Sequence, residues 1–112
     1  MAGRAHVIDL SDADFPTRVA TGVTLVHVCA PWSAVCHAEQ RVLGAIAEAM
    51  GGRAVIASID AERSRLPPRL GIRAVPTVLV FKDGQEVERL VGAQRRDDLL
   101  AALERHLGKP GA

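Results

Sequence analysis

Aromatic residues and cysteines are scarce in this sequence. The 112 residues include three aromatic side chains, Phe15, Trp32 and Phe81, and no tyrosine. So few rings cannot build the stacking platforms on which single-stranded nucleic acids bind. The two cysteines, Cys29 and Cys36, are too few for a disulfide framework and fit no four-ligand zinc pattern. Any chemical role for these cysteines therefore points to redox chemistry.

The chain also lacks an excess of charge and a long apolar run. Fourteen basic and thirteen acidic side chains give a formal net charge of +1, which creates no field to attract a polyanion or an acidic membrane. Charged and polar residues interrupt the first fourteen positions, at Arg4, His6, Asp9, Asp12 and Asp14. No signal peptide or membrane span fits there. We therefore expect a cytoplasmic protein without a nucleic-acid or membrane partner.

The composition is that of one globular domain. Hydrophobic residues make up 48% of the chain and charged residues 24%, so it can bury a core. We expect a single domain over residues 1–112, with its core in about residues 5–107 and a flexible tail at 108–112. His6, His37 and His106 are scattered along the chain, so the sequence predicts no metal site and no cofactor.

Apolar periodicity predicts alternating strands and helices. Runs rich in β-branched residues predict strands at residues 7–8, 24–29, 54–59, 77–81 and 86–91. Apolar residues at helical spacing, with caps and breakers, predict helices at residues 11–20, 34–50 and 97–107 and a short one within 60–70. Asp83-Gly84 predicts an antiparallel hairpin between the last two strands. This order indicates an α/β fold, with a central mixed sheet flanked by helices on both faces.

Four short motifs add a family resemblance. They are residues 30–36 (Ala-Pro-Trp-Ser-Ala-Val-Cys), 71–77 (Gly-Ile-Arg-Ala-Val-Pro-Thr), 81–84 (Phe-Lys-Asp-Gly) and 91–93 (Val-Gly-Ala). In this order and spacing they resemble the thioredoxin family over about residues 5–107. The resemblance implies a thioredoxin fold and an origin in thiol–disulfide redox homeostasis.

The main departure from that family lies at Ser33. The family's active motif is Trp-Cys-Gly-Pro-Cys, and Ser33 stands where its nucleophilic first cysteine would be, which leaves a Ser-x-x-Cys motif with Cys36. A serine hydroxyl ionises too weakly at neutral pH to attack a disulfide without a dedicated base. We therefore expect inefficient dithiol turnover, and a redox-weak or redox-silent module that binds peptides or proteins as a chaperone or assembly adaptor.

Two alternatives retain redox chemistry. Where the family has a buried aspartate, this chain has His27. The lysine that pairs with that aspartate in the family is replaced by Ser58, and Cys29 takes the place of a family tryptophan under the active loop. His27 and Cys29 share one face of a strand, so both can approach Cys36. One alternative is a monothiol disulfide oxidoreductase that uses Cys36, activated by a helix N-terminus and by His27. The other is an atypical dithiol protein in which Cys29 is the redox partner of Cys36. The competing interpretation without redox chemistry is that Cys36 is an unreactive remnant of the family motif and that His27 is a structural residue of the core.

The resemblance also implies a peptide groove. Pro76 after Val75 matches the family's cis-proline, which leaves the preceding backbone free to pair with an extended peptide. The expected groove is formed by Trp32, Val75, Pro76, Gly92 and Ala93. The expected partners are protein or peptide clients beside Pro76, and a thioredoxin reductase if the protein is active.

Overall fold

The computed structural model describes residues 6–108, in which strands and helices alternate as the sequence predicts. The strands are β1 (Val7–Asp9), β2 (Val23–Cys29), β3 (Val55–Asp60), β4 (Thr77–Lys82) and β5 (Gln85–Val91). The helices are α1 (Phe15–Val19), α2 (Ala34–Met50), α3 (Leu66–Arg69) and α4 (Arg96–Leu107). Most of the expected flexible tail, residues 109–112, lies outside the described residues.

The strands form one mixed sheet with the order β1-β3-β2-β4-β5. Strands β1 and β2 run parallel to β3, whereas β4 is antiparallel to both β2 and β5. The predicted mixed sheet is thus confirmed, and its central strand is β2. Strand β2 is hydrogen-bonded to β3 on one edge and to β4 on the other, so its backbone polar groups are satisfied within the sheet. Its side chains form the middle of the molecule.

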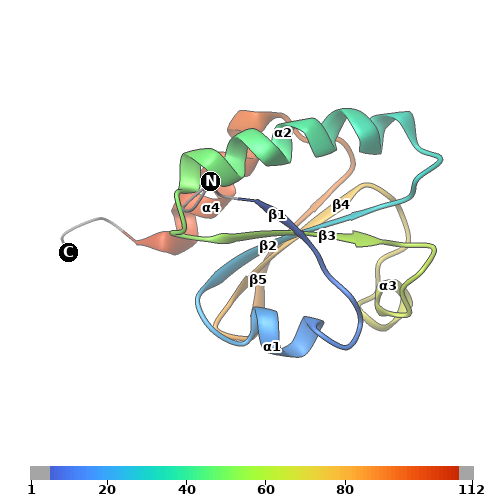
Figure 1. Ribbon diagram of the computed structural model, residues 1–112, viewed down its shortest axis with the longest axis horizontal. Helices are drawn as coiled ribbons and strands as arrows, with labels where there is room; N and C mark the ends of the chain where they lie inside the picture. The colour runs from blue at the N-terminus through green and yellow to red at the C-terminus, as the bar shows by residue number, and fades with distance from the viewer. Residues whose placement is uncertain (1–5, 109–112) are drawn as a thin grey trace.

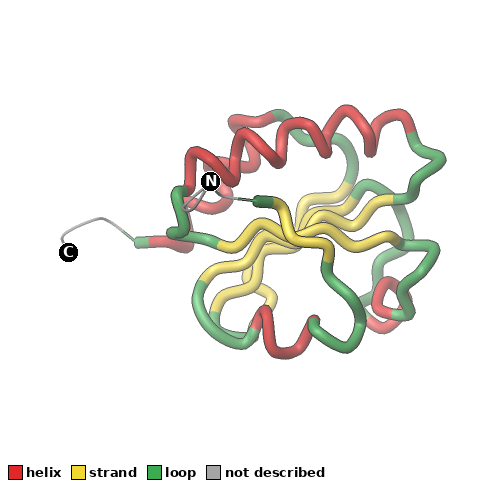
Figure 2. Tube along the Cα trace, in the orientation of Figure 1, coloured by secondary structure: helices red, strands yellow, loops and turns green. Residues whose placement is uncertain are grey.

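Helices cover both faces of the sheet (Figures 1 and 2), with α2 and α4 on one side and α1 and α3 on the other. The core follows the same division, because side chains alternate along a strand. Leu25 of β2 packs with Leu43 of α2 and Leu103 of α4. Val26 of β2 instead packs with Phe15 of α1. The uniformly buried β2 strand is therefore a consequence of two helical layers.

One helix differs clearly from its predicted bounds. Helix α1 begins at Phe15 rather than near Ser11, because Ser11 Oγ accepts the Asp14 N–H at 3.2 Å within a preceding turn. Helix α3 is one turn long and lies within the predicted range of residues 60–70. The predicted hairpin is confirmed: Asp83 and Gly84 both have positive φ, 49° and 87°.

Among residues 6–108, no helix has the combination of length and apolar character that crossing a bilayer requires.

Candidate active site

The two cysteines form a disulfide in the structure. Cys29 is the last residue of β2 and Cys36 lies in the first turn of α2, with their Cα atoms 5.5 Å apart. The connection between them is tight, because Ser33 N–H donates to the Ala30 carbonyl at 3.1 Å. This turn brings the start of α2 back over the end of β2. Both cysteines are almost fully buried, with relative exposures of 6% and 2%.

Ser33 begins helix α2. Its backbone is extended (φ −91°, ψ 119°) and its Oγ accepts the Cys36 N–H at 3.2 Å, so it is the N-cap. A serine is among the best residues for this position, because its oxygen satisfies a free helix N–H. The structure therefore places Ser33 next to Cys36 as a helix cap.

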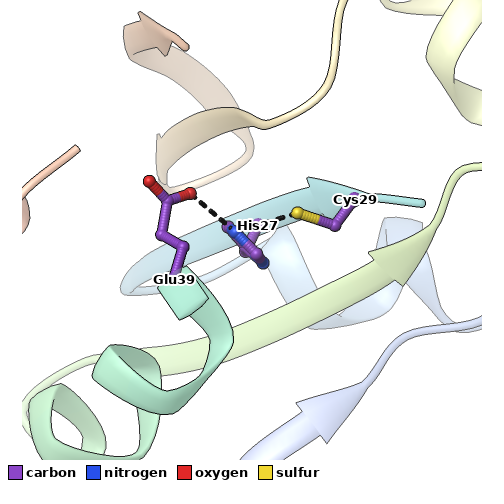
Figure 3. Close-up of side chains that lie close together, drawn as sticks. All are labelled: His27, Cys29 and Glu39. Atoms are coloured by element: carbon purple, nitrogen blue, oxygen red, sulfur yellow. Dashed lines mark hydrogen bonds and ion pairs between the residues drawn. The ribbon is translucent and has the colours of Figure 1, made fainter. Parts of the chain in front are cut away.

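His27 lies beneath the disulfide on β2. Its Nε2 atom is 3.1 Å from Cys29 Sγ and 2.7 Å from a carboxylate oxygen of Glu39 (Figure 3). The ring is fully buried, and its Nδ1 atom has no hydrogen-bond partner among the described residues. The sulfur that His27 contacts is thus Cys29, and this differs from the expected contact with Cys36.

Glu39 is the residue that the sequence analysis missed. It is 4% exposed, and its second carboxylate oxygen accepts the Gln94 N–H at 2.6 Å. One side chain thereby joins α2, β2 and the loop before α4. A signal existed in the sequence: Glu39 follows Cys36 by three residues and precedes Leu43 by four, which places it on the buried stripe of its helix.

A cavity of about 710 Å³ reaches the disulfide. Its lining includes Cys29, Cys36, Pro31, His37, Ser58 and Asp60, and it extends to the end of β1 and the following loop. Ser58 is thus close to the site, paired in register with His27 across β2 and β3. At the outer part of the cavity, hydrogen bonds to Asp12 from the Ser64 hydroxyl and from the Arg65 N–H lower the pKa of that carboxyl.

The residues of the expected peptide groove do not line the cavity at the disulfide. Trp32 is 70% exposed, and with Val75 it lines a separate shallow hollow. Its indole N–H donates to Glu62 at 2.7 Å, so the ring is held at the surface. The Val75–Pro76 peptide bond is cis, and the Pro76 carbonyl accepts the Gly92 N–H at 2.9 Å. Ala93, the remaining expected groove residue, is exposed.

Comparison with known proteins identifies the family. The Thioredoxin family model matches residues 6–105. The chain belongs to the thioredoxin family. A thioredoxin from Staphylococcus aureus is 35% identical over 102 residues, which cover 90% of this chain and 98% of that protein.

Solved thioredoxin structures show the same fold. A mutant thioredoxin from Halobacterium salinarum superposes with a TM-score of 0.88 at 27% identity, covering 97% of each chain. The thioredoxin from Malassezia sympodialis superposes with a TM-score of 0.84, also at 27% identity, covering 96% of each chain. The predicted thioredoxin fold is therefore confirmed.

The expectation of a redox-silent binding module is wrong. It rested on the serine at the position of the family's first cysteine, and the alternative of an atypical dithiol protein with Cys29 as the partner of Cys36 fits the structure better. In this thioredoxin-family protein, Cys36 is instead joined to Cys29, so the redox pair is not set by the Ser-x-x-Cys spacing.

Proposed function

We propose that this protein is a thiol–disulfide oxidoreductase that alternates between the Cys29–Cys36 disulfide and the corresponding dithiol. The observation that carries the proposal is the disulfide itself, in a chain of the thioredoxin family. In the reduced state the two thiols hold the two electrons that a substrate disulfide needs. Transfer leaves the protein oxidised and the substrate with two thiols.

The order of the two steps is proposed from the surroundings of each sulfur. Cys36 lies in the first turn of α2, where helix N–H groups stabilise an anion, so its thiolate attacks the substrate disulfide first. One substrate sulfur leaves as a thiolate, and the other is bonded to Cys36. Cys29 then attacks the Cys36 sulfur of this mixed disulfide, which forms the Cys29–Cys36 bond and releases the second substrate thiol.

The proton of Cys29 has a nearby acceptor. His27 Nε2 lies 3.1 Å from the Cys29 sulfur and shares a hydrogen bond with Glu39. We assign the His27–Glu39 pair to take up the Cys29 proton as that thiol becomes the attacking thiolate: Nε2 accepts it while the proton that Nε2 shares with Glu39 moves to the carboxylate. The proton then passes to the departing substrate thiolate, which balances the step. Ser33 contributes by capping the helix that carries Cys36.

The proposed partners are disulfide-bonded proteins and a reductase of the thioredoxin reductase class. The groove around Trp32, Val75, Pro76, Gly92 and Ala93 is the proposed contact surface for the protein client. Its support is the exposed Trp32, which lines a shallow hollow together with Val75. A cytoplasmic location, where such a reductase operates, is part of this proposal.

The test is a paired measurement of thiols and turnover. The oxidised protein should have no titratable thiol and the reduced protein two, and the wild type should catalyse reduction of a disulfide-bonded test protein by dithiothreitol. Cys29→Ser and Cys36→Ser should each abolish turnover, because the exchange cannot be both started and resolved. Undiminished turnover in Cys29→Ser would contradict the proposed pair. The control is Glu48→Gln, at an exposed position of α2, the helix that carries Cys36, and its turnover should equal that of the wild type.

A further inference from the structure

Three side chains with metal-binding atoms converge under the active-site turn. The donor atoms of His27, Cys29 and Glu39 all lie within 4.8 Å of one another, and all three residues are buried. Cys36 adds a fourth donor beside this group, because its sulfur is bonded to that of Cys29. Two thiolates, an imidazole and a carboxylate form a donor set that suits Zn²⁺. The disulfide occupies both sulfurs in the oxidised state.

His27 presents one ring nitrogen to both of its neighbours. Its Nε2 atom faces both Glu39 and Cys29, while Nδ1 is buried without a partner among the described residues (Figure 3). Carboxylate and sulfur thus lie around the same imidazole nitrogen, which groups three donor atoms of the kinds that bind Zn²⁺.

We propose that the reduced protein binds one Zn²⁺ through Cys29, Cys36, His27 and Glu39, and that formation of the Cys29–Cys36 disulfide expels it. The inference rests on the proposed function, because it requires the disulfide to be reducible. It departs from the sequence-based expectation of a protein without a metal site. That expectation considered ligand spacing along the chain, whereas these ligands come from two elements.

The two elements provide a rigid frame for such a site. His27 and Cys29 are two residues apart on β2 and point to one face, and Cys36 and Glu39 are three apart on α2 and share one side of that helix. Ligands at Zn²⁺ distances in a tetrahedron are about 3.3–3.8 Å from each other. Nε2 is now 2.7 Å from Glu39 and 3.1 Å from Cys29, so the donors need to separate by about half an ångström or more. Reduction of the disulfide frees the two sulfurs to take such positions, and the Glu39 carboxylate has to move away from Nε2 by a rotation of its own side chain.

Charge also favours a cation in the reduced state. Ionisation of both thiols beside the Glu39 carboxylate would gather three negative charges in a site where every residue is buried. Uncompensated buried charge is strongly unfavourable. A divalent cation compensates two of these charges directly. In the oxidised state both thiolates are absent, and the His27–Glu39 hydrogen bond replaces that compensation.

An ion has a route to the site. The cavity of about 710 Å³ reaches both cysteines, and its lining includes three aspartates, Asp9, Asp12 and Asp60, and one arginine, Arg63. The carboxylates outnumber the guanidinium, so they attract a cation toward the sulfurs. When a substrate disulfide oxidises the zinc-bound dithiolate, the two sulfurs give up two electrons and form their bond. The substrate takes these electrons with two protons to become two thiols, and Zn²⁺ leaves.

Titration with Co²⁺, a spectroscopic substitute for Zn²⁺, tests this inference. After removal of metal with a chelator, reduced wild type should bind one Co²⁺ and develop intense visible bands of tetrahedral cobalt with sulfur-to-cobalt charge transfer. Zn²⁺ should displace Co²⁺ with 1:1 stoichiometry, and the oxidised protein should show neither signal. Absence of the tetrahedral spectrum in the reduced wild type would overturn the inference.

Variants identify the ligands. Glu39→Gln should weaken Zn²⁺ binding at least about tenfold and alter the cobalt spectrum, as loss of an anionic ligand requires. The matched change Glu48→Gln, on the exposed side of α2, should leave both unchanged. Because Glu39→Gln can disturb folding, Cys36→Ser gives an independent test and should lower the charge-transfer intensity. Unaltered binding and spectra in both variants would exclude these residues as ligands.

The same samples separate this inference from the proposed function. Turnover measured with a chelator present reports only on the redox pair. Two titratable thiols and normal turnover without a cobalt spectrum would reject the zinc site and leave the oxidoreductase standing. Failure to obtain two thiols or turnover would reject the oxidoreductase, and with it the redox-gated site.

Discussion

At the scale of single residues, Glu39 is the side chain outside the apolar core whose removal should lower the free energy of unfolding the most. It accepts hydrogen bonds from the Gln94 backbone and contacts His27, in a fully enclosed position. Glu39→Ala leaves the buried His27 ring and the partly buried Gln94 N–H without their partner, so we expect the free energy of unfolding of the oxidised protein to fall by about 2–3 kcal/mol. Urea denaturation measures it. Glu48→Ala, exposed on the same helix, should change the free energy by less than about 0.5 kcal/mol.

Ser33 allows a second test at this scale, between a capping and a catalytic role. Loss of the N-cap oxygen in Ser33→Ala should lower the free energy of unfolding by about 1 kcal/mol, whereas Ser33→Asp should keep most of it. Turnover of Ser33→Ala should stay within about threefold of the wild type, because the redox electrons belong to the two cysteines. A loss of turnover as large as that of Cys36→Ser would assign Ser33 a direct chemical role instead.

At the scale of elements, Glu88 connects β5 to α4. Its carboxylate binds the Arg105 guanidinium and lies 2.8 Å from His106 Nε2. The hydrogen bond from Arg105, opposed by partial burial and supported by His106, lowers the pKa of Glu88. A lowered pKa in the folded state means that this contribution to stability is present at neutral pH and is lost as the pH falls through the acid range.

Glu88→Gln should therefore destabilise the protein by about 1 kcal/mol at pH 7, and the difference from wild type should shrink between about pH 5 and pH 3. Denaturation curves across this range measure the effect. Glu104→Gln is the control, since its partner Arg53 forms a pair that is about half exposed. A pH-independent difference for Glu88→Gln would show that shape rather than charge joins the two elements.

At the scale of the whole molecule, the disulfide constrains the unfolded chain. It closes a loop between residues seven apart in sequence. For so short a loop, chain entropy predicts that reduction lowers the free energy of unfolding by about 2–3 kcal/mol. Denaturation with and without dithiothreitol, in the presence of a chelator, measures this difference. The double variant Cys29→Ala/Cys36→Ala should respond identically under both conditions, and a wild type that does so would show no reducible structural bond.

The sequence alone determined the order of the elements, because local chemistry controls each of them. The apolar β2 strand requires cover on both faces, Asp83-Gly84 suits a tight hairpin, and Gly51 ends α2 in the left-handed conformation, with φ 55°. The start of α1 was predicted less well, since it depends on the turn in which Ser11 accepts the Asp14 N–H.

Only the tertiary structure decided which residues meet at the site. Whether Cys29 pairs with Cys36 depends on the path of the turn between them, which brings their Cα atoms to 5.5 Å, and no spacing rule fixes that distance. Glu39 is a charged residue on an amphipathic helix, and sequence reasoning ordinarily assigns such a residue to the solvent. Its burial against His27 follows from the rotation of α2 over the sheet, which is set by the packing of Leu43 and Ile46. The sequence shows which side chains are present and which elements carry them. The contact between the site residues of β2 and those of α2 depends on how the core packs.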